Sequence, residues 1–181
     1  MKNNINDFCY NNAANFVTIL NMVFGTFSII ASIHSKFSFT IGLIFLASVA
    51  DRYDGKIARK LNTDSPLGVQ LDSMGDVISF GLAPAILIYM SNFLSAPHGI
   101  RFLGMIGCVF YVACGGFRLA RYNISGLNEN NTFTGLPITI AGTLLVAIYL
   151  IFRSFIHPLV YCIILLLLGF LEISKIAIKK A

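Results

Sequence analysis

The sequence has 181 residues, of which 56% are hydrophobic and 12% are charged, and its formal net charge is +5. With a mean hydropathy of +0.78, the chain is too apolar for an ordinary soluble domain. Its basic residues gather at the ends of apolar runs and form no separate basic helix or patch, so a nucleic-acid partner is excluded. The composition therefore predicts an all-α integral membrane protein.

The chain opens on a polar head, residues 1–14, in which Ile5, Phe8 and Tyr10 are interspersed. Such a segment can lie at the membrane surface as a short amphipathic helix; a frayed terminus is the alternative. We expect an N-terminal interfacial segment over residues 1–14, followed by one membrane domain over residues 15–181.

Apolar runs recur along the rest of the chain, each near the ~20 residues that cross the hydrocarbon as a helix. Short polar connections separate them. The predicted architecture is a bundle of six transmembrane helices. Their expected bounds are Asn15–Ile33, Phe39–Ala58, Val69–Ser91, Gly99–Leu119, Leu136–Phe152 and Pro158–Ser174.

The cations predict the orientation, because Lys and Arg in short loops are biased toward the cytoplasm. With the N-terminus inside, only Lys36, Arg101 and Arg153 fall on the outer side. We expect a multi-pass protein of the cell membrane with both termini in the cytoplasm. The basic excess also favours contact with anionic membrane lipids.

Four acidic residues cluster at the end of the second span and the start of the third: Asp51, Asp54, Asp72 and Asp76. Ionised carboxylates at membrane depth are costly unless they are paired or bind a cation. Each pair projects from one helix face, since the spacings are i,i+3 and i,i+4. A short connection makes the two helices antiparallel neighbours. The pattern predicts a carboxylate cage that favours Mg²⁺, Mn²⁺ or Ca²⁺ over zinc.

Small residues lie beside these carboxylates: Gly55 and Ala58 follow Asp51, and Gly68 precedes Asp72. Small residues in membrane helices often serve close helix packing, but here they also leave room for a ligand. Arg59 adds a forked donor that suits phosphate oxygens. Metal ligands, small residues and an arginine together predict a diphosphate site.

The stretch from Asp51 to Asp76 reads DRYDGKIARKLNTDSPLGVQLDSMGD. It resembles the signature of the CDP-alcohol phosphotransferases, D-x2-D-G-x2-A-R-x8-G-x3-D-x3-D, without a departure. The resemblance covers essentially the whole chain. It implies six membrane helices, an interfacial N-terminal segment and a homodimer.

The resemblance also implies roles for single residues. Asp51, Asp54 and Asp72 would bind one metal ion, and Asp51, Asp72 and Asp76 a second, the ions being Mg²⁺ or Mn²⁺. Asp76 would also be the general base. Residues implied at the CDP-lipid are Asn15, Thr18, Gly55, Ala58, Arg59, Ser65 and Gly68. Asn15 and Thr18 have helix capping as an alternative role.

Three further segments resemble the phosphatidylserine synthase branch of that family: SFGLAPA (Ser79 to Ala85), FRLARYN (Phe117 to Asn123) and FTGLP (Phe133 to Pro137). This resemblance implies transfer of a phosphatidyl group from CDP-diacylglycerol to L-serine. Arg118, Arg121 and Asn123 are the candidates for binding the acceptor. Anchoring to lipid phosphate is the alternative for the two arginines.

Other functions stay open on the sequence alone. Glycerol 3-phosphate or inositol phosphate are alternative acceptors, although a dianion should require more cationic groups than the site offers. An archaeal-type lipid donor is also compatible. An ion-coupled transporter is the rival from another class, since it too would need acidic residues within the membrane.

Overall fold

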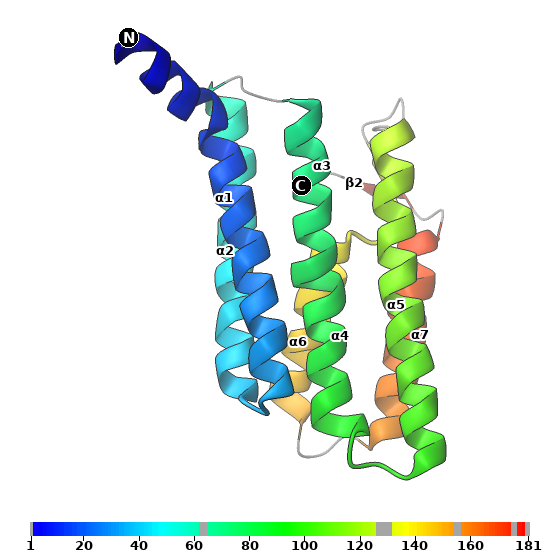
Figure 1. Cartoon of the computed structure of the whole chain (residues 1–181). Coiled ribbons are helices and arrows are strands. Elements are labelled where there is room, and N and C mark those ends of the chain that lie inside the picture. The colour runs from blue at the N-terminus through cyan, green and yellow to red at the C-terminus, as the bar shows by residue number, and fades with distance from the viewer. Residues whose placement is uncertain (1, 62–64, 126–131, 154–156, 175–176, 180–181) are drawn as a thin grey trace.

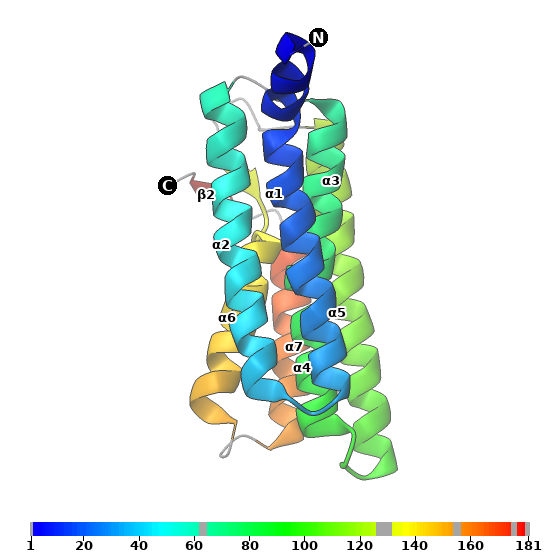
Figure 2. The same cartoon turned by 60° about the vertical axis from the view of Figure 1, so that its left-hand side comes forward.

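The computed structural model describes residues 2–61, 65–125, 132–153, 157–174 and 177–179. Side chains are described for residues 15–53, 56, 65–124, 135–153 and 157–174. These parts of the chain form an elongated bundle of helices that run up and down (Figures 1 and 2).

The helices of the described residues make up six rods. The first two are α1 (Lys2–Ile33) and α2 (Phe37–Leu61). The third is continuous but changes its winding, from α3 (Pro66–Asp76) through the π-helical η1 (Val77–Leu82) and α4 (Ala83–Ile88) to the π-helical η2 (Tyr89–Phe93). The last three are α5 (His98–Ser125), α6 (Ile138–Phe152) and α7 (Pro158–Ile173).

All six predicted spans are helical, and each helical rod extends over most or all of its predicted range. A short antiparallel ribbon of β1 (Thr132–Thr134) and β2 (Ala177–Lys179) was not anticipated. The ribbon ties the segment after α5 to the segment after α7, at the end of the bundle that carries the N-terminus (Figure 1).

Three helices in the described part of the chain are long and apolar enough to cross a membrane: Asn15–Ile33, Pro66–Phe93 and His98–Ile124. Helices α6 and α7 are apolar but have 15 and 16 residues. A 15-residue helix spans about 22 Å, less than the ~30 Å hydrocarbon core. The three long helices indicate a membrane protein, and six crossings stay a prediction.

Helices α1 and α2 form a hairpin that buried hydroxyl groups hold together. Ser35 takes a left-handed conformation in the turn, with φ 58°. The Ser32 hydroxyl donates to Thr40 Oγ1 at 3.2 Å, and the Thr40 hydroxyl lies 3.3 Å from the Ser28 carbonyl oxygen. In an apolar surrounding such bonds fix the relative position of two helices, because an unmade bond is costly there.

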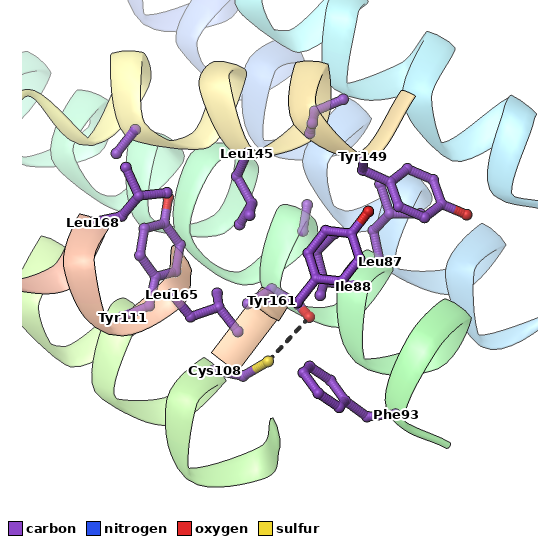
Figure 3. Packing of buried hydrophobic residues seen from close by; sticks show 14 of the residues in the cluster. Leu87, Ile88, Phe93, Cys108, Tyr111, Leu145, Tyr149, Tyr161, Leu165 and Leu168 are labelled. Carbon is purple, nitrogen blue, oxygen red and sulfur yellow. Dashed lines mark hydrogen bonds between the residues drawn. The ribbon is translucent and has the colours of Figure 1, made fainter. Parts of the chain in front are cut away.

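The main apolar core lies where α4, α5, α6 and α7 meet (Figure 3). Tyr111, Leu145, Tyr161 and Leu165 are fully buried there. The Cys108 thiol donates to the Ala85 carbonyl oxygen at 3.4 Å. Large apolar side chains also cover the outside of the bundle, as expected for a surface in contact with lipid. Those more than half exposed include Phe45, Phe102, Val109, Ile151 and Ile163.

Candidate functional site

Three of the four predicted metal-binding carboxylates lie together. Asp51 comes from α2, and Asp72 and Asp76 come from successive turns of α3. One oxygen from each lies within 4.8 Å of the other two. A cation with metal–oxygen distances of about 2.1–2.5 Å fits among ligands spaced in this way. The cluster could therefore hold a divalent metal ion.

The chemistry of the cluster favours a cation as well. Asp76 is buried and the other two are half-buried. The Asp51 and Asp76 carboxyl groups are close enough to share a hydrogen bond, which requires a proton on one of them. A bound cation removes that requirement, because it compensates the repulsion between carboxylates. Oxygen ligands alone suit Mg²⁺ or Mn²⁺ better than zinc.

The fourth predicted ligand, Asp54, lies in α2, as do Gly55, Ala58 and Arg59. Their side chains lie outside the described part of the chain. The roles of these four residues therefore stay predictions.

Helix α1 forms the third wall of the site and contacts both α2 and α3 (Figure 2). Thr18 is buried. A Cβ atom on Gly68 would lie 3.1 Å from Asn15 Oδ1. Asn15 and Gly68, both predicted at the CDP-lipid, are thus neighbours across the α1–α3 contact. The sequence predicted that α2 and α3 pack directly against each other. In the described structure each of them packs more extensively against α1.

Asn21 lies one turn beyond Thr18 and was not among the predicted site residues. It is fully buried, and both polar atoms of its side chain lack a hydrogen-bond partner in the described structure. A Cβ atom on Gly75 would lie 3.2 Å from Asn21 Nδ2, which places the amide beside the backbone between Asp72 and Asp76. The sequence did offer a signal for Asn21, since it is a polar residue within an apolar helix, three positions after Thr18.

Ser65 has a structural role at the start of α3. It is the N-cap residue, and its Oγ accepts a hydrogen bond from the backbone N–H of Gly68 at 3.0 Å. Pro66 follows at the first helical position, where its missing N–H costs nothing. This cap fixes where the helix that carries Asp72 begins.

Removing the cap should therefore weaken α3. Ser65→Ala is expected to lower the stability by about 1 kcal/mol, measured as a lower thermal midpoint in detergent. Ser65→Asp should retain most of the stability, because an aspartate also caps a helix. An unchanged thermal midpoint in Ser65→Ala would contradict the capping role.

The three acceptor candidates lie at the end of α5, on the same end of the bundle as the carboxylates. Asn123 Nδ2 donates to Ser73 Oγ at 2.9 Å, which ties α5 to α3 beside Asp72. Arg121 Nη1 lies 3.5 Å from the Ile173 carbonyl oxygen at the end of α7. Arg118 is 5% exposed and lies within electrostatic range of Asp76.

Glu172, in the last turn of α7, is the second polar residue that the sequence analysis did not select. It is fully buried and lies within electrostatic range of Arg118. Its signal was an acidic residue inside a predicted apolar span, the same feature that singled out Asp72 and Asp76.

The sequence matches the family model described as CDP-alcohol phosphatidyltransferase over residues 11–172. It is 38% identical over 167 residues to the CDP-diacylglycerol–serine O-phosphatidyltransferase of Methanocaldococcus jannaschii. The aligned region covers 92% of this chain and 73% of that protein. The Bacillus subtilis protein of the same name is 33% identical over 160 residues, 88% of this chain and 85% of the relative. The archaetidylserine synthase of Methanothermobacter thermautotrophicus is 37% identical over 163 residues, 88% and 66% of the two chains. This chain belongs to the CDP-alcohol phosphatidyltransferase family.

Proposed function

We propose that this chain is a membrane-bound serine phosphatidyltransferase, which converts CDP-diacylglycerol and L-serine to phosphatidylserine and CMP. The observation that carries the proposal is the cluster of Asp51, Asp72 and Asp76, in a chain that belongs to the CDP-alcohol phosphatidyltransferase family. The relatives named as serine phosphatidyltransferases support serine as the acceptor.

In the proposed reaction, the serine hydroxyl oxygen forms a bond to the phosphorus that carries diacylglycerol. The bond from that phosphorus to the bridging oxygen breaks, and CMP leaves with that oxygen. Asp76, buried at the cluster, accepts the hydroxyl proton. Divalent metal ions held by the four aspartates, two in number by family resemblance, would neutralise charge on the diphosphate and orient it for in-line displacement.

The donor would lie along the contact between α1 and α3. Asn15 and Gly68 are neighbours there, and Thr18 is buried about one turn further along α1. A small residue such as Gly68 lets a nucleotide approach the backbone closely. Gly55, Ala58 and Arg59 on α2 complete the proposed CDP-lipid site. Ser65 contributes by capping α3, whatever contact it makes with the nucleotide.

One lipid tail has a suitable place between α2 and α6. A largely apolar cavity of about 430 Å³ is lined from Ile41 to Arg52 on α2 and from Thr143 to Leu150 on α6. Arg52, one of the lining residues, directly follows Asp51 in α2. We propose that the cavity receives a hydrocarbon tail of the donor. Both an acyl chain and an ether-linked chain are included, because one relative is named as an archaetidylserine synthase.

The same proposal covers the setting of the enzyme. Six membrane crossings, an interfacial segment over residues 1–14, cytoplasmic termini and a homodimer are parts of it. The first turns of α1 bend away from the bundle (Figure 1), which is compatible with a segment that lies along the membrane surface.

The test is CMP release by the purified protein from CDP-diacylglycerol with Mg²⁺ or Mn²⁺. Serine, glycerol 3-phosphate and inositol phosphate are supplied separately, and a reaction without acceptor is the control. We expect release with serine alone and phosphatidylserine as the lipid product. Release with glycerol 3-phosphate alone would overturn the acceptor assignment, and cation transport without any CMP release would favour a transporter.

A further inference from the structure

Arg118 and Glu172 are a buried basic and a buried acidic residue that lie near each other on α5 and α7. Arg118 is 5% exposed and Glu172 is 0% exposed. They lie within electrostatic range of each other. Within the described structure, Arg118 Nε and both carboxylate oxygens of Glu172 nevertheless lack a hydrogen-bond partner. The two side chains are thus neighbours without being directly paired.

The Glu172 carboxylate is directed at the face of α5 that carries Arg118. A Cβ atom on Gly115 would lie 3.2 Å from Glu172 Oε1, and Gly115 precedes Arg118 by three residues, about one turn. Gly115 therefore leaves the space that the carboxylate uses. Other polar groups within electrostatic range of the pair include Tyr111, Cys114, Arg121, Tyr122 and Asp76.

Leaving such groups unsatisfied is expensive. A buried charged group without hydrogen bonds loses more on leaving water than a neutral one, and a direct ion pair would have been the simplest remedy. An arrangement that keeps an acidic and a basic side chain buried but apart is complementary to a ligand that carries one charge of each sign. A zwitterion with the two charges on neighbouring atoms has that form.

The location connects the pair to the reaction. The Arg118 guanidinium lies within electrostatic range of both Glu172 and Asp76, the proposed general base. A small acceptor held by Arg118 and Glu172 would thus have its hydroxyl group directed toward the metal cluster. Asn123, bound to Ser73 beside Asp72, lies at the same end of α5.

We propose that Arg118 and Glu172 form the acceptor subsite, in which the guanidinium binds the carboxylate of serine and Glu172 binds its ammonium group. This inference rests on the proposed function and extends it to the residue that recognises the amine. It also predicts discrimination against phosphorylated acceptors, because a dianion next to the buried Glu172 carboxylate would be repelled.

The test compares serine with two analogues that each lack one charge. Glycerate replaces the ammonium group with a hydroxyl, and ethanolamine lacks the carboxylate. The wild-type enzyme is expected to prefer serine over either by about 100-fold or more in kcat/KM. Glu172→Gln should reduce the preference over glycerate by at least about tenfold, and Arg118→Gln should do the same for ethanolamine.

Matched controls lie on the same helices. Tyr161→Phe removes a buried hydroxyl of α7 that makes no hydrogen bond in the described structure, and Arg101→Gln removes a cation at the opposite end of α5. Both should keep the wild-type preferences. The KM for CDP-diacylglycerol should change by less than about twofold in Glu172→Gln; a purely structural role would lower activity toward all acceptors alike.

A measurement on the wild-type enzyme covers the case in which a variant fails to fold. L-alanine, which keeps both charges but lacks the hydroxyl, should compete with serine at least about tenfold better than propionate or ethylamine. Equal competition by all three, or unchanged preferences in a folded Glu172→Gln, would overturn the subsite while leaving serine transfer intact. A wild-type enzyme that releases no CMP with serine would instead overturn the proposed function.

Discussion

Asp72→Asn is expected to reduce CMP release from CDP-diacylglycerol and serine by at least about a thousandfold, a loss of about 4 kcal/mol of transition-state stabilisation. Asp72 lies within 4.8 Å of Asp51 and Asp76, measured between carboxylate oxygens. It belongs to both ligand sets that the family resemblance implies. An asparagine keeps the size of the side chain but supplies a neutral oxygen, so the affinity for a hard divalent cation falls.

Gln70→Ala is the matched control for this variant. Gln70 is exposed on the same helix, two residues before Asp72, so its loss tests for general damage to α3. We expect nearly full activity in Gln70→Ala and, without added divalent cation, a normal thermal midpoint in both variants. Asp72→Asn with more than about a tenth of wild-type activity would remove the carboxylate cluster from the proposed mechanism.

The sequence alone predicted the helices well, for a physical reason. Apolar runs of about 20 residues between short polar connections leave a chain in lipid few choices except helices. Local sequence signals also mark helix starts: Ser65 caps α3, and Pro66 follows at its first position. The β1–β2 ribbon has no comparable signal, since it depends on two segments far apart in the chain meeting.

The aspartate cluster was predicted because its members repeat at helical spacings, so one helix face could be inferred for each pair. Asn21 and Glu172 were missed because their significance depends on other helices. Asn21 matters through its contact with Gly75, and Glu172 through its proximity to Arg118. The π-helical winding of η1 directly after Asp76 was not predicted either; α1 and α6 both pack against that segment.

Removal of divalent cations is expected to stop CMP release completely, and Mg²⁺ or Mn²⁺ should restore it. The reason is the ligand chemistry of Asp51, Asp72 and Asp76, which offers carboxylate oxygens only. The measurement is serine-dependent CMP release after EDTA treatment, followed by titration with each cation. Zn²⁺ should restore less activity at equal concentration, since the described cluster holds no His or Cys ligand.

Binding can be separated from catalysis by thermal unfolding in the absence of substrates. A cation that binds the folded protein stabilises it by about 2.7 kcal/mol when its concentration is 100 times the dissociation constant. The midpoint should therefore rise with Mg²⁺ or Mn²⁺ in the wild type and in Gln70→Ala, and rise much less in Asp72→Asn. Full CMP release after EDTA, or an equal cation-dependent rise in Asp72→Asn, would contradict a metal site at these carboxylates. The cluster would then need another explanation for three acidic groups held together at the ends of apolar helices, where each is costly without a cation.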